Sequence, residues 1–321
     1  MHGNVESDAS VSAPERLIGR IVRLRPQGFP WVAPTWPGSM TRPAPERHLG
    51  SNYGAGWSRR YPVRLARAVV LDNLTRPLTH LVASPTVRGD ELLELVTAPA
   101  IFVANHTSHL DTPLLLSVLP PRLRHRLVVA AAADTFFDRR WKAHLFAFAL
   151  PAIPIERRRI NRQSGDDAAE LIEDGWSLII YPEGGRSTDG WQQEFGGSAA
   201  YLAVRTGRPV VPVHIDGTWR VLPKGGERIH RSRTAVTFGT PISPDPGEST
   251  RHFNVRIERA VSTLADESHT DWWSARRRSA DGSTPSPRGP EGSSWRRAWE
   301  LGPAPDPNDK NDDRRWALRR R

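Results

Sequence analysis

Short apolar runs alternate with helical patterns between residues 86 and 266. The apolar runs predict strands at 100–104, 126–131, 152–155, 177–181, 210–215 and 235–238. Helical spacing of apolar residues predicts helices at 112–119, 140–150, 164–174, 198–206 and 251–266. The runs are continuous in Val, Ile and Leu instead of alternating with polar residues, so we expect a sheet that is covered on both faces. The pattern is typical of an α/β domain.

The segments that flank this region differ from it in composition. Residues 1–60 are rich in Pro, Gly, Ser and Arg, and cannot bury enough apolar surface to offset their ordering entropy, so we expect a basic, disordered arm. Residues 61–84 predict an amphipathic lead helix, interrupted near Pro77, that either lies on a membrane or packs on the next domain. We place the main domain at 85–268 and a disordered, Arg/Trp-rich tail at 269–321.

The tail leaves more than one partner open. Tryptophan interleaved with arginine suits a membrane interface, where indole lies at headgroup level and guanidinium pairs with phosphate. The same residues suit single-stranded nucleic acid, through stacking and phosphate contacts. A solvated tail without a dedicated partner is equally compatible with the pattern.

Composition narrows the chemistry. The 321 residues carry a formal charge of +10, which favours a polyanionic partner: nucleic acid, anionic lipid headgroups or phosphorylated metabolites. There is no cysteine, so disulfides, thiolate catalysis and zinc–cysteine sites are excluded. The histidines are not spaced as metal ligands, and we expect no metal. No apolar run reaches about 18 residues and the N-terminus lacks a signal-peptide pattern, so we expect neither a membrane span nor a signal peptide.

The first polar cluster, Asn105–Asp111, follows the strand at 100–104. Ser108 can cap the next helix, and Asp111 falls in the first turn of that helix. His106 then lies outside the helix, where its Nδ1 can be held by the Asp111 carboxylate. The alternative is a capping motif next to a surface histidine.

Three further segments follow predicted strands or lie in them. Tyr181–Ser187 forms a turn at Pro182, Gly184 and Gly185, and Glu183 and Arg186 offer an acceptor and a fork-shaped donor that suit a phosphate site. Arg157, followed by Arg158 and Arg159, could add positive charge after the strand at 152–155. Pro212 lies inside a strand, which predicts a sheet edge or a bulge beside a groove.

In chain order, with the Arg157 segment second and Tyr181–Ser187 third, the four segments resemble the four motifs of the glycerolipid (lysophosphatidate) acyltransferase family, over roughly residues 85–241. The resemblance implies an α/β fold with a mixed, largely parallel central sheet and helices on both faces. It implies acyl transfer from acyl-CoA or acyl carrier protein to a hydroxyl of a lysophospholipid, in the first place 1-acylglycerol-3-phosphate, with no cofactor beyond the acyl donor.

The resemblance also assigns roles to residues. His106 is the expected general base, and Asp111 orients and charge-compensates its imidazole. The expected substrate-binding residues are Asn105, Ser108, Arg157, Glu183, Gly184, Gly185, Arg186, Ser187 and Pro212. Among them, Glu183, Gly184, Arg186 and Arg157 hold the acceptor phosphate, and the segment around Pro212 lines the acyl site.

The sequence departs from the family pattern in three places. Glu156 precedes Arg157, Gly185 stands where Thr is common, and Gly196 follows Phe195 where lysine is common. These departures concern the acceptor, so an acyltransferase for another lysolipid or a glycolipid is one alternative. A thioesterase and a non-catalytic protein that binds membrane or nucleic acid are the others.

The expected partners follow from these inferences. They are an acyl thioester, with acyl carrier protein as one possible donor, a lysophospholipid acceptor and an anionic membrane surface; nucleic acid is not expected. We expect a cytoplasmic, peripheral protein on the inner face of the cell membrane.

Overall fold

The structure describes most of the chain between residues 55 and 292. The computed structural model describes residues 55–97, 99–132, 144, 147–150, 152–155, 162–226, 228–292 and 297. These residues all belong to one structural unit, His48–Arg321. The arm expected at 1–60 lies almost wholly outside the described residues, as do Arg157 and most of the helix expected at 140–150.

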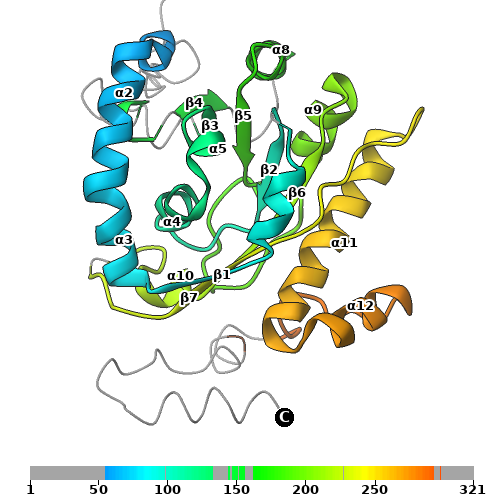
Figure 1. Ribbon diagram of the computed structural model, residues 1–321. Helices are drawn as coiled ribbons and strands as arrows, with labels where there is room; N and C mark the ends of the chain where they lie inside the picture. Colours follow the sequence, from blue (N-terminus) through cyan, green and yellow to red (C-terminus); the bar gives the residue numbers. More distant parts are fainter. Residues whose placement is uncertain are drawn as a thin grey trace, which may run out of the picture. The chain divides into compact units, whose positions relative to one another are not determined.

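A seven-stranded sheet forms the centre of the described residues, in the order β1-β7-β6-β2-β5-β3-β4 (Figure 1). Its strands are β1 Pro85–Arg88, β2 Ile101–Ala104, β3 Leu127–Ala132, β4 Ala152–Ile155, β5 Ser177–Ile180, β6 Val210–Asp216 and β7 Thr234–Phe238. Neighbours from β6 through β4 are parallel, whereas β7 is antiparallel to β6 and parallel to β1. The expected mixed, largely parallel sheet is confirmed.

Strand β1 was not among the predicted strands. Its four residues include Pro85 and Arg88, so they do not form an apolar run. A proline and a charged residue are tolerated here because β1 is an edge strand that pairs only with β7.

Helices cover both faces of the sheet, as expected (Figure 1). They are α2 Tyr61–Val70, α3 Arg76–Ala83, α4 Asp111–Val118, α5 Pro121–Arg124, α8 Arg162–Glu173, α9 Ser198–Thr206, α10 Thr218–Val221, α11 Thr250–His269 and α12 Trp272–Ala280. Single helical turns occur at Ala55–Arg59, Leu71–Thr75 and Asp90–Leu95. One core lies between the sheet and α3–α5, and a second lies under α8, α9 and α11.

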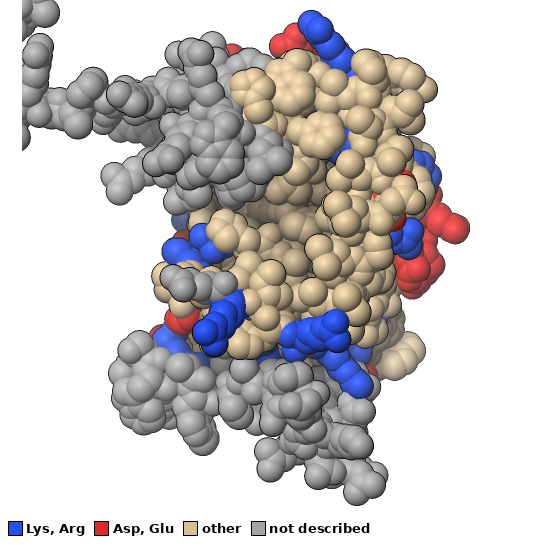
Figure 2. All heavy atoms as spheres, turned by 90° about the vertical axis from the view of Figure 1, so that its left-hand side faces the viewer, with Lys and Arg blue, Asp and Glu red and all other residues tan. Residues whose placement is uncertain are grey.

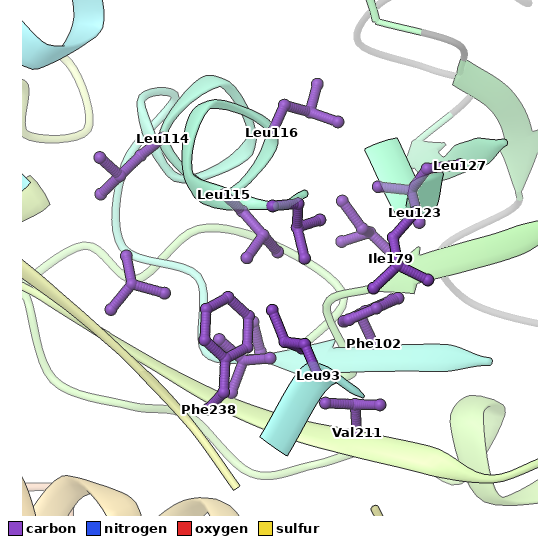
Figure 3. Close-up of a cluster of buried hydrophobic side chains, with 14 of the residues drawn as sticks. Leu93, Phe102, Leu114, Leu115, Leu116, Leu123, Leu127, Ile179, Val211 and Phe238 are labelled. Atoms are coloured by element: carbon purple, nitrogen blue, oxygen red, sulfur yellow. The ribbon is translucent and has the colours of Figure 1, made fainter. Parts of the chain in front are cut away.

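Strand β2 shows why the apolar runs are continuous. Successive side chains of a strand point to opposite faces, so Phe102 and Ala104 enter the core under α4, and Ile101 and Val103 enter the core under α9 and α11. All four residues are fully buried. Figure 3 shows Phe102 packed with leucines of α4 in the first core. The strand therefore presents its last residue, and the turn that follows, at a fixed place.

The predicted lead helix is one continuous helical segment. Helices α2 and α3 are joined by a π-helical turn, Leu71–Thr75, and Pro77 is the second residue of α3. Because proline cannot donate a backbone hydrogen bond, the widened turn accommodates it without a break. The segment packs on the domain through Arg67, Leu71, Thr79 and Ala83, all buried.

Unlike a typical surface helix, this segment buries an arginine and exposes large apolar side chains. The Arg67 guanidinium donates to the carbonyl oxygens of Ser58, Ala147 and Phe148. The outward side carries apolar residues that are each at least 55% exposed: Tyr61, Leu65, Val69, Leu74, Leu78 and Leu81. We call these six residues the apolar stripe. In the part of the chain that is described, no helix has the length and hydropathy of a membrane span.

The structure differs from the expected tail over Trp272–Ala280, which forms α12. Asp271 caps this helix, and Ala275 is buried. Arg278 pairs with Asp266 of α11 through two hydrogen bonds of 2.7 and 2.8 Å, so α11 and α12 form one unit. Helix α12 is poor in apolar residues, and its packing on α11 includes this ion pair and the hydrogen bond from Thr263 to Ser279, contacts that composition does not predict.

Candidate active site

His106 and Asp111 meet in the turn between β2 and α4. The Nδ1 of His106 lies 2.8 Å from Oδ2 of Asp111. The same oxygen accepts hydrogen bonds from the backbone N–H groups of Thr107 and Ser108, at 2.8 and 2.9 Å. The Asp111 side chain is fully buried, whereas that of His106 is 17% exposed. The turn therefore holds a buried carboxylate behind an imidazole that reaches the surface.

Ser108 does not cap α4. Leu110 is the N-cap residue, and it has no side-chain cap. The Ser108 hydroxyl instead accepts from the Leu110 N–H and donates to the Leu222 carbonyl oxygen, at 2.8 Å. The Asp111 carboxylate binds the N–H groups of Thr107 and Ser108, so it stabilises the turn before α4 and does not cap the helix itself.

The loop that follows β5 holds His106 from three sides. Glu183 Oε1 accepts a 2.9 Å hydrogen bond from the His106 N–H, and the Ser187 N–H donates to the His106 carbonyl oxygen at 2.9 Å. Tyr181 stacks on the imidazole, with ring centroids 4.1 Å apart. Its hydroxyl lies 2.9 Å from that of Thr112 on α4. The first and third sequence motifs are thus one structural unit.

Both carboxylate oxygens of Glu183 accept hydrogen bonds from the protein backbone. Oε2 accepts a 3.0 Å hydrogen bond from the Gln193 N–H, in addition to the bond from His106. Burial raises the pKa of Glu183 to about 8, although these two N–H bonds act in the opposite direction. In the geometry Glu183 joins two loops, and its expected contact with a phosphate stays a prediction.

Asn105 and Ser187 also direct their side chains into the protein. The Asn105 amide exchanges two 2.8 Å hydrogen bonds with the backbone N–H and C=O of Ile215, which ties the end of β2 to β6. The Ser187 hydroxyl donates to Asp189 at 2.9 Å. Both residues are buried. Both residues lie at the site, but their side chains bind other parts of the protein, Ile215 and Asp189.

Pro212 lies in a central strand, so the expected sheet edge is wrong, but the alternative, a bulge, is confirmed: the Val210–Ile242 bridge is one residue out of the register that pairs Val213 with Phe238. Its carbonyl oxygen accepts from the Gly239 N–H, one residue beyond the end of β7. The ladder between β6 and β7 ends at Val213 and Phe238, and only an isolated bridge follows. The N–H that proline lacks therefore falls in this interruption, where no ladder bond is lost.

The Gly184–Arg186 turn is open and positively charged. Gly184 has φ +69°, and a Cβ added at Gly184 or Gly185 would meet no atom within 4 Å. Burial, with a further contribution from the Arg186 charge, lowers the pKa of His109 to about 4. Lys224 reaches the same turn, because its Nζ donates to the Arg186 carbonyl oxygen at 3.0 Å. A phosphate fits this combination of accessible backbone and cations.

Sequence reasoning missed two polar residues that contact the site. Thr218, fully buried, donates its hydroxyl hydrogen bond to Asp111 Oδ1. Tyr181 was noted as part of a motif, but its stacking on His106 was not predicted. The available signal for Thr218 was its place after a buried strand, where α/β sheets carry their sites.

Known proteins with similar sequences share this region. A family model described as Acyltransferase matches residues 84–216. The 1-acyl-sn-glycerol-3-phosphate acyltransferase BAT2 of Brassica napus is 30% identical over 147 residues, 44% of this chain and 40% of that protein. LPAT1 of Arabidopsis thaliana, of the same name, is 30% identical over 161 residues, 49% and 43% of the two chains. The chain thus spans less than half the length of these two relatives.

A solved structure has the same fold. The 1-acyl-sn-glycerophosphate acyltransferase PlsC of Thermotoga maritima matches with a TM-score of 0.51 and 24% identity, covering 68% of this chain and 89% of that chain. The family match covers β2, the His106 turn, the Gly184 turn and β6. Residues 84–216 therefore match the acyltransferase family model, and the fold of the described residues agrees with that match.

Proposed function

We propose that this protein transfers an acyl group from a thioester, acyl-CoA or acyl carrier protein, to a hydroxyl of 1-acylglycerol-3-phosphate. The observation that carries the proposal is the His106–Asp111 pair at 2.8 Å, whose backbone is bonded to the turn that carries Arg186. Two turns that are hydrogen-bonded to each other thus combine a base with a cationic anchor. The names of the relatives agree with this acceptor.

The chemistry needs one base and no covalent enzyme intermediate. Asp111 occupies Nδ1 of His106, which leaves Nε2 to take the proton of the acceptor hydroxyl. The hydroxyl oxygen attacks the thioester carbonyl carbon, the C–O ester bond forms, and the C–S bond breaks. The thiolate then receives the proton from the imidazolium, which the Asp111 carboxylate stabilises meanwhile.

The acceptor phosphate would bind at the Gly184–Arg186 turn. A phosphomonoester presents more negative charge than a phosphodiester, and Arg186 and Lys224 bring two cations to this turn. The Gly184 N–H donates to the Tyr181 carbonyl oxygen at 3.2 Å, and the missing side chains at Gly184 and Gly185 leave space for a phosphate beside Arg186. These features support a lysophosphatidate acceptor over a neutral glycolipid.

The apolar stripe supports an anionic membrane as the surface on which the protein works. Figure 2 shows the face that carries α2 and α3: its middle is largely uncharged, and Lys and Arg gather towards one end. Exposed Arg228, Arg231 and Arg233 follow α10, and the Ser232 N–H donates to the Val82 carbonyl oxygen at the end of α3. Apolar side chains would enter the acyl layer while arginines contact headgroup phosphates.

The test is a product assay on the purified full chain. It is offered acyl-CoA and acyl carrier protein donors with a panel of phosphorylated and neutral lysolipids, and products are identified by mass. We expect phosphatidic acid from 1-acylglycerol-3-phosphate. His106→Ala is expected to lower kcat by about a hundredfold to ten-thousandfold. His252→Gln, an exposed histidine on α11, is the matched control and retains full activity.

The outcomes separate the alternatives. Absence of ester product with every pair of substrates contradicts the proposal. Release of free fatty acid in place of ester identifies a thioesterase. Preference for a neutral acceptor keeps the reaction but replaces its substrate. Full activity of His106→Ala would contradict the assignment of the base.

A further inference from the structure

A buried threonine from the segment after β6 touches the Asp111 carboxylate. Thr218 is fully buried and begins α10, 107 residues away from Asp111 in the sequence. Its hydroxyl donates to Asp111 Oδ1, and it lies 3.0 Å from the hydroxyl of Thr107. The side of Asp111 that faces away from His106 is therefore in contact with a second part of the chain.

We propose that Thr218 is a positioning residue, which holds the Asp111 carboxylate in the orientation that directs Oδ2 at His106. The inference rests on the proposed function, because it assigns a role in the same proton transfer. Thr218 itself does not touch the reacting atoms. It acts through Asp111.

The hydrogen-bond directions follow from proton count. A threonine hydroxyl has one proton to donate, and that of Thr218 goes to the carboxylate, which can only accept. The 3.0 Å contact with Thr107 must then be donated by Thr107 to Thr218. The result is a relay from Thr107 through Thr218 to Asp111. Successive hydrogen bonds of this kind polarise and strengthen one another.

The two carboxylate oxygens of Asp111 accept different numbers of hydrogen bonds. Oδ2 accepts from His106 and from two backbone N–H groups. Among the described residues, Thr218 donates the one hydrogen bond that Oδ1 accepts. Without that donor, one oxygen of a fully buried carboxylate loses its partner, and the group can turn about its Cβ–Cγ bond. The bond to His106 would then lose its alignment.

Thr218 is held in place by its own surroundings. Gly217 adopts φ +83°, and a Cβ there would lie 2.4 Å from the Arg233 carbonyl oxygen, so the turn before Thr218 requires glycine. The Leu222 N–H donates to the Thr218 carbonyl oxygen at 3.0 Å. The Leu222 carbonyl oxygen in turn accepts from Ser108. The segment is therefore tied to the His106 turn at both ends of α10.

The test is Thr218→Val, which keeps the shape of the side chain but removes the donor. We expect kcat for acyl transfer to fall about tenfold to a hundredfold, and the KM values of donor and acceptor to change less than about twofold. Thr218→Ser restores the donor and is expected to recover most of kcat. Thr234→Val is the matched control: Thr234 is also buried, and its hydroxyl donates to the Ala83 carbonyl oxygen at 3.0 Å, away from the site.

Thermal unfolding of all three variants separates positioning from stability. We expect Thr218→Val and Thr234→Val to lose similar stability, while only the first loses kcat per folded molecule. If Thr218→Val does not fold, Thr218→Ala removes the hydroxyl without a second methyl group and must show the same loss of kcat. If the wild type is active and the kcat of Thr218→Val and Thr218→Ala is unchanged, this inference alone is overturned. An inactive wild type overturns the proposed function, and the inference with it.

Discussion

At the residue scale, His106 is restrained at its backbone and at one ring nitrogen. Its N–H and C=O are bonded to Glu183 and Ser187, its Nδ1 to Asp111, and its ring stacks on Tyr181. Because the His106 ring is already held in place, it loses little conformational entropy when a substrate binds. Several residues of the matched motifs therefore serve to hold one imidazole.

Glu183→Gln tests this restraint. A glutamine side chain has one acceptor oxygen, so it can accept from His106 or from Gln193 but not from both. We expect the free energy of unfolding to fall by about 1 kcal/mol, and kcat to fall because His106 is less well placed. Urea denaturation and initial rates measure the two effects. Glu173→Gln, an exposed glutamate on α8, is the control and changes neither. Unchanged kcat in Glu183→Gln would contradict the restraint.

At the element scale, β6 and the segment after it connect remote parts of the site. Ile215 binds the Asn105 amide, Thr218 binds Asp111, Leu222 binds Ser108, and Lys224 reaches the Arg186 turn. Residues 215–224 thus run along the whole His106 turn. This element explains how a cation can reach the turn although glycine follows Phe195 in this sequence.

Lys224→Gln tests whether that cation binds the acceptor. We expect the KM for 1-acylglycerol-3-phosphate to rise about twofold to fivefold, since an exposed ionic contact contributes up to about 1 kcal/mol. The KM for acyl-CoA and the rate with a neutral lysolipid remain unchanged. Lys224→Arg keeps the charge and is expected to behave as the wild type. Equal KM values for the phosphorylated acceptor in all three proteins would exclude this role.

Strand β6 also predicts a pH dependence of stability, through His214 under α11. Burial lowers the pKa of His214 to about 4, with opposing influences of Asp216 and His269, and its Nδ1 has no partner among the described residues. Between pH 4 and 6.5 the unfolded chain binds a proton that the folded protein does not, so stability falls as the pH falls through this window. We expect His214→Leu to flatten the dependence measured by urea denaturation. His230→Gln, an exposed histidine, should leave it unchanged.

At the scale of the whole molecule, the lead segment turns Arg67 and Leu71 inward and the apolar stripe outward. The buried Arg67 attaches the segment to the domain, so the apolar stripe faces away from it. The two roles considered for this helix, packing and membrane contact, are thus compatible, because they use opposite sides.

Replacing Leu65, Leu74 and Leu78 together by serine tests the stripe. We expect affinity for vesicles that contain anionic phospholipid to fall by about a hundredfold, because each leucine contributes at least about 1 kcal/mol on entering the acyl layer. Co-sedimentation measures binding, and raised salt should weaken the wild type further. Leu95→Ser with Val255→Ser, exposed apolar residues outside the stripe, is the control. Equal binding by the triple variant would exclude the stripe as the contact.

The strands and the His106–Asp111 pair were accessible from sequence because they depend on short-range patterns. Six strands were expected close to their observed positions, since apolar runs buried on both faces carry a strong signal. Strand β1 and helix α12 were not expected, because they are held by an edge pairing and by the Arg278–Asp266 pair. Both are contacts between parts of the chain that no local pattern relates.

The amino-acid sequence by itself determined the fold class and the His106–Asp111 contact, because these two residues are five apart in the sequence and one turn brings them together. Only the tertiary structure decided which motif residues face the site and which support it. Glu183 meets His106 across 77 residues of sequence, and Thr218 meets Asp111 across 107. The physical reason is that the direction of a polar side chain depends on the partner that satisfies it on burial, and these partners come from distant strands.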